Sequence, residues 1–173
     1  MAILDIITAP HPILEMKARN VEPDEFGPEL AAHVKNMAET MYAAPGVGLA
    51  APQVSDPRRI LVIDSTSSKD AESRFFAMVN PEITERSNET IPWYETCLSV
   101  PGLEVKVMRN YRIKVEWQDP ADGSKKSGWF EEYESVIVQH EMDHLLGTVL
   151  LDRVSRFKKS RYLSKARKAA RVR

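Results

Sequence analysis

The stretch YESVIVQHEMDHLLG, residues 133–147, decides the central element of the fold. It has no proline and no glycine until Gly147, which stands where the glycine that ends a helix is expected. The β-branched run 136–138 taken alone favours a strand, but the length and the cap favour a helix over 133–146. One face of this helix repeats at helical spacing and carries Val136, Ile137, His140, Glu141, His144 and Leu145.

The apolar pattern predicts two further helices. The first is expected over 28–43, because Pro28 suits a first helical turn and Pro45 stops the helix soon afterwards. Its buried face would carry Leu30, Val34, Met37, Ala38 and Met41. The last helix is expected over 155–170, with an apolar stripe of Phe157, Leu163, Ala166 and Ala170.

The middle of the chain predicts strands. Residues 59–64 and 75–79 are short apolar runs, which are typical of buried strands. Residues 103–107 and 113–117 alternate apolar with polar side chains. We therefore expect two half-buried strands that pair antiparallel with each other across a turn at 109–110.

Loops are expected between these elements. The segment 46–53, GVGLAAPQ, is too rich in glycine and proline for a helix and should be extended or looped. A polar surface loop is expected over 65–73, and a tight turn at 119–123 precedes a return strand beginning at Gly128. Because the strands cluster without regular helical crossovers, the predicted class is α+β. Mainly antiparallel sheets would pack around the central helix, with a further helix at the C-terminal end.

Size and composition fit one ordinary domain. We expect a single domain over 1–173, of which 153–173 form a basic C-terminal helix. No apolar run approaches the roughly 20 residues that span a bilayer, and Asp5 stands where a secretory signal would carry basic residues. Cys97 is the only cysteine, which excludes an intrachain disulfide and suits a reducing compartment. A cytoplasmic protein without a membrane or DNA partner is therefore expected.

Charge is distributed unevenly along the sequence. From Arg153 onward there are ten lysines or arginines and no acidic residue, although the net charge of the whole chain is only -1. One interpretation is a solvated helix that offsets the acidic remainder of the protein. The other is a docking element for an anionic surface such as ribosomal RNA, in which case binding would depend on salt.

The predicted central helix carries a pattern suited to metal chemistry. His140 and His144 are four residues apart, so their ring nitrogens can face one point. Glu141 lies beside them, as in the H-E-x-x-H arrangement of metal hydrolases, where the glutamate is the general base. Histidines on a helix face are more often simply polar, and two ligands are too few for a metal site.

Cys97 is the natural third ligand. Most free cysteines are small buried hydrophobic residues, and that alternative remains open here. The cysteine lies in ETCLS, residues 95–99, directly before Val100-Pro101-Gly102, where a strand would meet a turn and could approach the helix. Two imidazoles and one thiolate leave a fourth position open, which is typical of catalytic sites.

Three segments together resemble a known family. GVGLAAPQ at 46–53, ETCLS at 95–99 and QHEMDHLLG at 139–147 are similar, in order and spacing, to the three signature motifs of peptide deformylases. Those enzymes remove the formyl group from N-formylmethionine on newly made bacterial and organellar proteins. The resemblance covers most of the chain, from Pro10 to about Asp152.

The resemblance implies a role for each motif. Cys97, His140 and His144 would hold one metal ion, typically ferrous iron in this family, with zinc, nickel or cobalt able to substitute. Glu141 would take a proton from the attacking water and give it to the leaving amine. Gln53, through its side-chain amide, and Leu98, through its backbone N–H, would stabilise the oxyanion. The backbone of Gly46, Val47 and Gly48 would pair with the substrate, an N-formylated nascent peptide.

The chain departs from the family pattern at two positions. Thr96 replaces the usual glycine before the cysteine, and it would be strained if that position requires a positive φ. Glu104 stands where family members often have a basic residue. Both changes concern substrate handling more than metal binding. A second hypothesis concerns support for the site: Glu95 is expected to hold Arg109 and brace the cysteine loop.

Two alternative functions follow from these departures. One is a deformylase-like protein with altered substrate specificity, and the other is a binding module that a metal only stabilises. A zinc endopeptidase of the H-E-x-x-H type fits less well, because its third ligand lies downstream of the helix on the chain.

Overall fold

The structure is a computed structural model that describes residues 2–66 and 72–171, without the side chains of the last two. It has the α+β organisation expected from the sequence, with antiparallel sheets and α-helices. Among the described residues, no helix is both long and apolar enough to cross a membrane. The loop expected over 65–73 falls partly outside the described residues, because residues 67–71 are not among them.

The main sheet has five antiparallel strands in the order β1-β2-β3-β6-β7. Its strands are β1 Gly48–Ala50, β2 Ile60–Asp64, β3 Phe75–Arg86, β6 Arg112–Gln118 and β7 Lys125–Glu131. β2 matches the predicted strand, whereas β3 continues well past its predicted end at residue 79. β7 begins three residues before Gly128. β1 lies at one edge of this sheet, which leaves one side of its backbone unpaired within the sheet.

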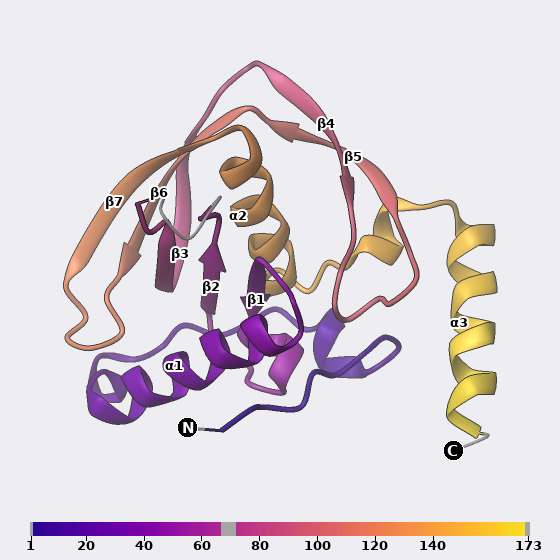
Figure 1. The fold of residues 1–173 in the computed structure, drawn as a ribbon, viewed down its shortest axis with the longest axis horizontal. Coiled ribbons are helices and arrows are strands. Elements are labelled where there is room, and N and C mark those ends of the chain that lie inside the picture. The colour runs from indigo at the N-terminus through magenta and orange to yellow at the C-terminus, as the bar shows by residue number, and fades with distance from the viewer. Residues whose placement is uncertain (1, 67–71, 172–173) are drawn as a thin grey trace.

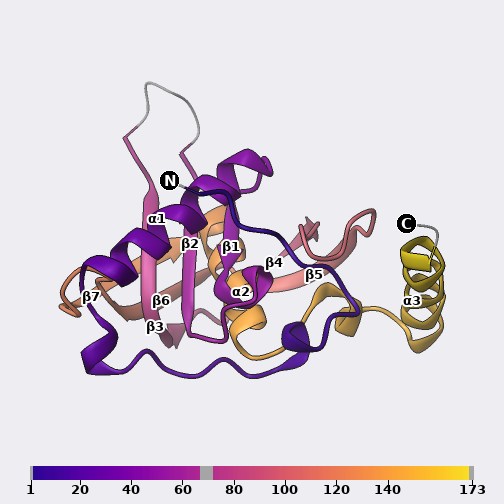
Figure 2. The same ribbon diagram turned by 90° about the horizontal axis from the view of Figure 1, so that it is seen from below.

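Helices cover both faces of the main sheet (Figures 1 and 2). α1, Pro28–Ala43, has the predicted bounds, and it packs against Ile60 and Val62 of β2. Leu61 and Ile63, which point the other way from the same strand, pack with residues of α2, Glu132–Leu145. The continuous apolar run of β2 is therefore explained by burial on both faces.

The predicted pairing of strands 103–107 and 113–117 with each other is wrong. β5, Val105–Asn110, pairs with β4, Thr90–Glu95, in a separate two-stranded sheet, and β6 pairs with β3 and β7. Only Tyr111 separates β5 from β6, whereas a hairpin needs a loop of at least two residues. The chain bends there from one sheet into the other, and this bend passes over α2 just below the β3–β4 connection at the top of Figure 1.

α2 ends as its sequence predicts. The helical hydrogen bonds stop at Leu145, and Gly147 follows in the left-handed region with a φ of 74°. A Cβ at this glycine would lie 2.6 Å from the backbone oxygen of Glu15, so the tight turn also brings two segments into contact. This turn fixes the end of α2 against the N-terminal part of the chain.

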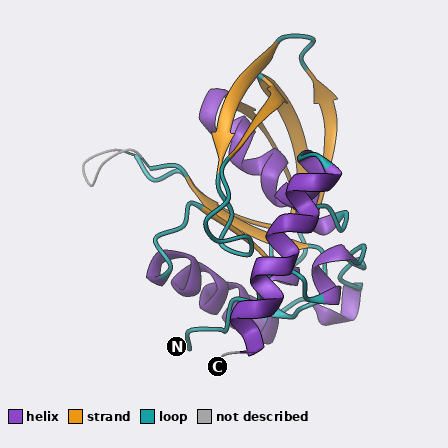
Figure 3. Ribbon diagram, turned by 90° about the vertical axis from the view of Figure 1, so that its right-hand side faces the viewer, coloured by secondary structure: helices purple, strands orange, loops and turns teal. Residues whose placement is uncertain are grey.

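The C-terminal helix stands beside the rest of the molecule (Figures 1 and 3). α3, Arg156–Arg171, follows the short 3-10 helix Leu150–Arg153. Tyr162 and Leu163 pack against a core that includes Val105 and Leu150. The predicted apolar stripe is wrong at Phe157, which is 76% exposed. The apolar contact of α3 is therefore made by its middle, Lys159 in its first turn pairs with Asp152, and most of its described basic side chains are open to solvent.

Candidate metal and active site

Cys97, His140 and His144 converge at one point. One donor atom from each residue lies within 4.8 Å of the others, and Cys97 Sγ is 3.3 Å from His144 Nε2. In a tetrahedral site with bonds of about 2.0–2.3 Å, ligand atoms are about 3.4–3.6 Å apart. α2 supplies both histidines from successive turns, and the loop after β4 supplies the cysteine. The spacing and the donor types therefore fit one transition-metal ion.

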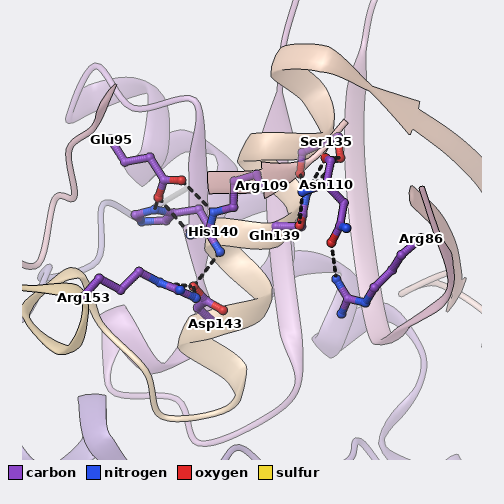
Figure 4. A network of polar contacts seen from close by, with 9 residues as sticks. All are labelled: Arg86, Glu95, Arg109, Asn110, Ser135, Gln139, His140, Asp143 and Arg153. Carbon is purple, nitrogen blue, oxygen red and sulfur yellow. Dashed lines mark hydrogen bonds and ion pairs between the residues drawn. The ribbon is translucent and has the colours of Figure 1, made fainter. Parts of the chain in front are cut away.

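A carboxylate behind His140 fixes the orientation of its ring. Glu95 Oε2 lies 2.8 Å from His140 Nδ1, so the other ring nitrogen faces Cys97 and His144. The predicted contact between Glu95 and Arg109 is confirmed, with Arg109 donating from Nε at 2.7 Å and from its second terminal nitrogen at 2.9 Å (Figure 4). His144 has no comparable support, because its Nδ1 is buried without a hydrogen bond among the described residues.

The surroundings of this group favour positive charge at His140. Burial lowers the pKa of His140, but hydrogen bonds to Cys97 and Glu95 raise it more, to about 10. The pKa of Glu95 is about 2, because its bonds to Arg109 and His140 outweigh the effect of burial. Burial holds the pKa of His144 well below its usual range, which keeps this ring neutral and able to bind a metal. The Glu95 carboxylate that favours a proton on His140 would equally favour a metal cation there, once the ring has lost that proton.

Glu141 is buried beside the three donor residues. Its Oε2 atom has no hydrogen-bond partner among the described residues. Burial raises the pKa of Glu141 to about 7, so its carboxyl group can both accept and release a proton near neutral pH. The backbone of Gly48 passes on the other side, so close that a Cβ there would lie 2.3 Å from Glu141 Oε1. Only glycine fits at this position without displacing the carboxylate.

A cleft of about 420 Å³ opens over these groups. One wall is the segment 45–48 and the other is 93–98, while α2 forms the floor. Trp93 stacks on Tyr133 at the cleft wall, with ring centroids 5.0 Å apart. The cleft therefore combines a polar end at Glu141 and His140 with apolar and aromatic walls, as small-molecule and peptide sites do.

Gln53 and Leu98 lie at the same end of the cleft. The Gln53 amide nitrogen is 3.7 Å from Cys97 Sγ and donates to Ser99 Oγ at 3.1 Å, while its oxygen accepts from the Ala50 N–H. Leu98 follows Cys97 directly, and its backbone N–H has no acceptor among the described residues. The structure thus brings both predicted oxyanion donors next to the cysteine.

Comparisons with known proteins place the chain in a family. A family model described as polypeptide deformylase matches residues 3–160. The chain belongs to the peptide deformylase family. A peptide deformylase of Hyphomonas neptunium is 41% identical over 170 residues, which cover 98% of this chain and 94% of the relative.

Solved deformylase structures share the fold. The peptide deformylase of Ehrlichia chaffeensis superposes with a TM-score of 0.89 at 33% identity, covering 99% of this chain and 98% of that one. A class I type b peptide deformylase of Acinetobacter baumannii, crystallised with Met-Ala-Ser bound, gives a TM-score of 0.81 at 32% identity. That match covers 88% of this chain and 99% of the other.

The structure also explains the two departures from the deformylase pattern. Thr96 is not among the described residues with positive φ, so the threonine fits this backbone without that strain. Its side chain is exposed and lines the cleft, which it narrows beside Cys97. Glu104 is exposed and does not line the cleft. Of the two substitutions, only Thr96 therefore changes the cleft directly.

Several residues of the deformylase cleft were missed from the sequence. β4 was not predicted as a strand, because Pro92 interrupts its pattern, and so Trp93 and Tyr94 were not placed at the site. Tyr133 could have been found, since it lies two helical turns before His140 on the same face of α2. Asp143, which lies outside the cleft, was overlooked because its partner Arg109 is distant in the sequence.

Proposed function

We propose that the protein removes the formyl group from N-formylmethionyl nascent polypeptides and releases formate, as a hydrolase with one metal ion. The observation that carries this proposal is the buried Glu141 carboxylate at the closed end of a cleft, next to the convergent Cys97, His140 and His144. Family membership supports the same reaction. The A. baumannii relative with bound Met-Ala-Ser supports a methionyl peptide as the ligand of this cleft.

In the proposed reaction Glu141 carries one proton in two steps, from the attacking water to the peptide nitrogen. When bound at this group, a divalent metal lowers the pKa of water to about 7 and polarises the formyl oxygen. Glu141 takes a proton from the water as the water oxygen attacks the formyl carbon. The carboxyl group then gives that proton to the peptide nitrogen as the C–N bond breaks, which leaves formate and a free amine. A pKa of about 7 suits both steps.

The developing negative charge needs nearby donors. We assign this role to the Leu98 N–H and the Gln53 amide, both beside Cys97. In the structure Gln53 contacts Cys97 and Ser99, so one amide hydrogen must turn from these partners to reach the substrate oxygen. Removing one oxyanion donor typically costs about 10²–10³ in rate, which is the loss expected for Gln53→Ala.

The free edge of β1 would bind the peptide backbone. Val47 accepts a hydrogen bond from Asp64, so the next residue, Gly48, turns its own N–H and C=O away from β2. These groups point from an edge strand on the wall of the cleft, where an extended peptide can add as a further strand. Gly46 and Val47 lie on the same wall and complete the proposed backbone site.

Ferrous iron is the metal we propose for the protein in the cell. Two nitrogen donors and one thiolate suit Fe(II), and they suit Zn(II), Ni(II) and Co(II) as well. Metal analysis after anaerobic purification tests this choice. Iron at one equivalent per chain is the expected result, and zinc in its place with full activity would contradict it.

Glu141→Gln tests the enzyme against a binding module with a structural metal. The variant keeps the shape of the side chain but removes the proton acceptor. We expect formate release from formyl-Met-Ala-Ser to fall by about 10²–10⁴, while one metal per chain is retained. A parent protein that binds metal but releases no formate would instead support the binding module. Turnover of other formylated peptides but not of formyl-Met-Ala-Ser would support altered specificity.

The basic segment 153–173 is proposed to contact the ribosome. Arg161, Lys165, Arg167 and Lys168 of α3 are exposed, and this helix stands away from the sheets (Figures 1 and 2). Replacing Lys165, Arg167 and Lys168 by glutamate should weaken ribosome association, and the salt dependence of binding should become shallower. The matched control changes three exposed lysines elsewhere: Lys17, Lys35 and Lys125. Equal effects of both triple variants would contradict a specific contact.

The place of action follows from the proposed substrate. Nascent formylated chains emerge from ribosomes, so we propose a cytoplasmic protein. We also retain the prediction that residues 1–173 form a single domain. Fractionation with ribosomes and a single unfolding transition are the corresponding measurements.

A further inference from the structure

A chain of ion pairs continues beyond the predicted contact of Glu95 with Arg109. The remaining terminal nitrogen of Arg109 donates to Asp143 Oδ2 at 2.8 Å. Arg153 donates to the same oxygen from Nε at 3.2 Å and from a terminal nitrogen at 2.5 Å. Figure 4 shows Arg109 between Glu95 and Asp143, with Arg153 reaching Asp143 from the other side. The connection runs from the His140 ring to the C-terminal segment.

Burial decreases outward along this chain. The side chains of Glu95 and Arg109 are 3% and 5% exposed, Asp143 is 20% exposed and Arg153 is 34% exposed. The inner pair is therefore shielded from salt and water, while the outer pair is partly screened. A change at Arg153 must accordingly have a smaller effect on the metal site than a change at Asp143.

Each member orients the next. Arg109 uses Nε and one terminal nitrogen for Glu95, which fixes the Glu95 carboxylate in the plane of the guanidinium. Glu95 in turn holds His140 Nδ1. Asp143 keeps the third nitrogen of Arg109 in place and neutralises charge between two guanidinium groups. Without that carboxylate, Arg109 and Arg153 would repel each other, and the paired hydrogen bonds from Arg109 to Glu95 would shift.

We propose that Asp143 and Arg153 are positioning residues for the metal ligand His140, acting through Arg109 and Glu95. The proposal rests on the metal site of the proposed function. Partners behind a metal-bound histidine set its orientation and basicity, and their loss typically weakens metal binding about 10–100-fold. Arg153 opens the basic C-terminal segment, so the relay links that segment to the stability of the metal site.

Metal release and cobalt absorption test the proposal in the full-length protein. Arg153→Ala is compared with Arg156→Ala, which removes the same charge three residues later from an exposed side chain without an ion pair among the described residues. We expect Arg153→Ala to release Co(II) to a chelator about 3- to 10-fold faster, and Asp143→Asn to do so by about 10-fold or more. The visible Co(II) absorption should change in both, and Arg156→Ala should match the parent protein.

Further variants separate positioning from a general loss of stability. Arg153→Lys keeps one donor and should restore part of the slow release. If Asp143→Asn does not fold, the comparison of the three Arg153 and Arg156 variants still decides the question. Identical release rates and spectra for Arg153→Ala and Arg156→Ala would overturn the relay. A folded parent protein that binds no Co(II) would instead overturn the proposed metal function, so the two failures differ.

Discussion

At the scale of single residues, Gly48 sets the geometry of Glu141. A Cβ at position 48 would lie 2.3 Å from Oε1 and 2.8 Å from Cδ of that carboxylate. Gly48→Ala must therefore displace Glu141, and we expect kcat/KM for deformylation to fall at least about 100-fold. Elemental analysis should still find one metal per chain, because the three proposed ligands are untouched.

Gly128→Ala is the control for this substitution. Gly128 lies on β7 outside the cleft, and a Cβ there would meet Trp117 at 3.3 Å, which requires only a small shift. It should keep nearly the activity of the parent protein. Parent-like turnover in Gly48→Ala would contradict the proposed role of Glu141 or its close approach to the backbone.

Thr96 gives a second prediction at this scale. Because its φ is not positive, a glycine there relieves no strain and only adds freedom to the unfolded chain. Thr96→Gly should lower the free energy of unfolding by up to about 1 kcal/mol, measured by urea denaturation. A stabilised variant would show that the threonine is strained after all.

At the scale of elements, the sequence predicted helices better than strand pairing. The bounds of α1 follow from Pro28 and Pro45, and those of α2 from its length and Gly147, since these signals are local. The alternation in β5 and β6 correctly predicted half-buried strands. Their partners could not be predicted, because β4 was not recognised as a strand and β3 is separated from β6 by two other strands. One residue, Tyr111, decides between a hairpin and a bend.

In the candidate site, too, local patterns could be predicted from the sequence and contacts between separate elements could not. Motif spacing predicted Cys97, His140, His144 and Glu141, and the fold brings them together. The aromatic wall and the relay through Asp143 depend on contacts between separate elements. No local pattern in the sequence carries that information.

The carboxylate of Asp56 links α1 to the segment before β2, and its contribution to stability depends on pH. Asp56, before β2, contacts His33 of α1 at 2.9 Å and Arg58 at 2.8 Å. Burial raises the pKa of Asp56, but these contacts lower it more, and the net pKa lies below the usual range. A depressed pKa stabilises the fold above the unfolded value of about 3.9, and this contribution is lost as pH falls below it.

Asp56→Asn tests this attachment. We expect the free energy of unfolding to fall on the order of 1–3 kcal/mol at pH 7, because two charge-assisted contacts are weakened. The difference from the parent protein should shrink as pH falls below about 4. The exposed Asp24→Asn serves as the control. A difference that stays constant from pH 7 to pH 3 would exclude titration of Asp56 as its cause.

At the scale of the whole molecule, the metal ligands join separate parts of the fold. Cys97 follows β4 of the smaller sheet, whereas His140 and His144 belong to the helix packed on the main sheet. A bound metal should therefore stabilise the native arrangement of the smaller sheet, α2 and the main sheet. Chelation should lower the Tm of a single transition, and readdition of Co(II) or Fe(II) should restore it. Two separate transitions would contradict the prediction of one domain.

The charge distribution also acts at this scale. The sequence has ten basic residues from Arg153 onward, and those from Arg156 to Lys168 belong to α3, which touches the rest of the protein mainly through Tyr162 and Leu163. Arg153 itself pairs with Asp143, so the segment has both an inward contact and an outward basic surface. The proposed docking surface and the proposed support of the metal site therefore lie on one segment.

Formate release by the iron-loaded protein tests the central claim most directly. The full-length chain is purified without oxygen, loaded with Fe(II) and incubated with formyl-Met-Ala-Ser, and formate and Met-Ala-Ser are measured together. The proposed function predicts one formate for each Met-Ala-Ser over many turnovers, with at least about a 100-fold loss in Glu141→Gln. A folded protein with one metal per chain that releases no formate would contradict it.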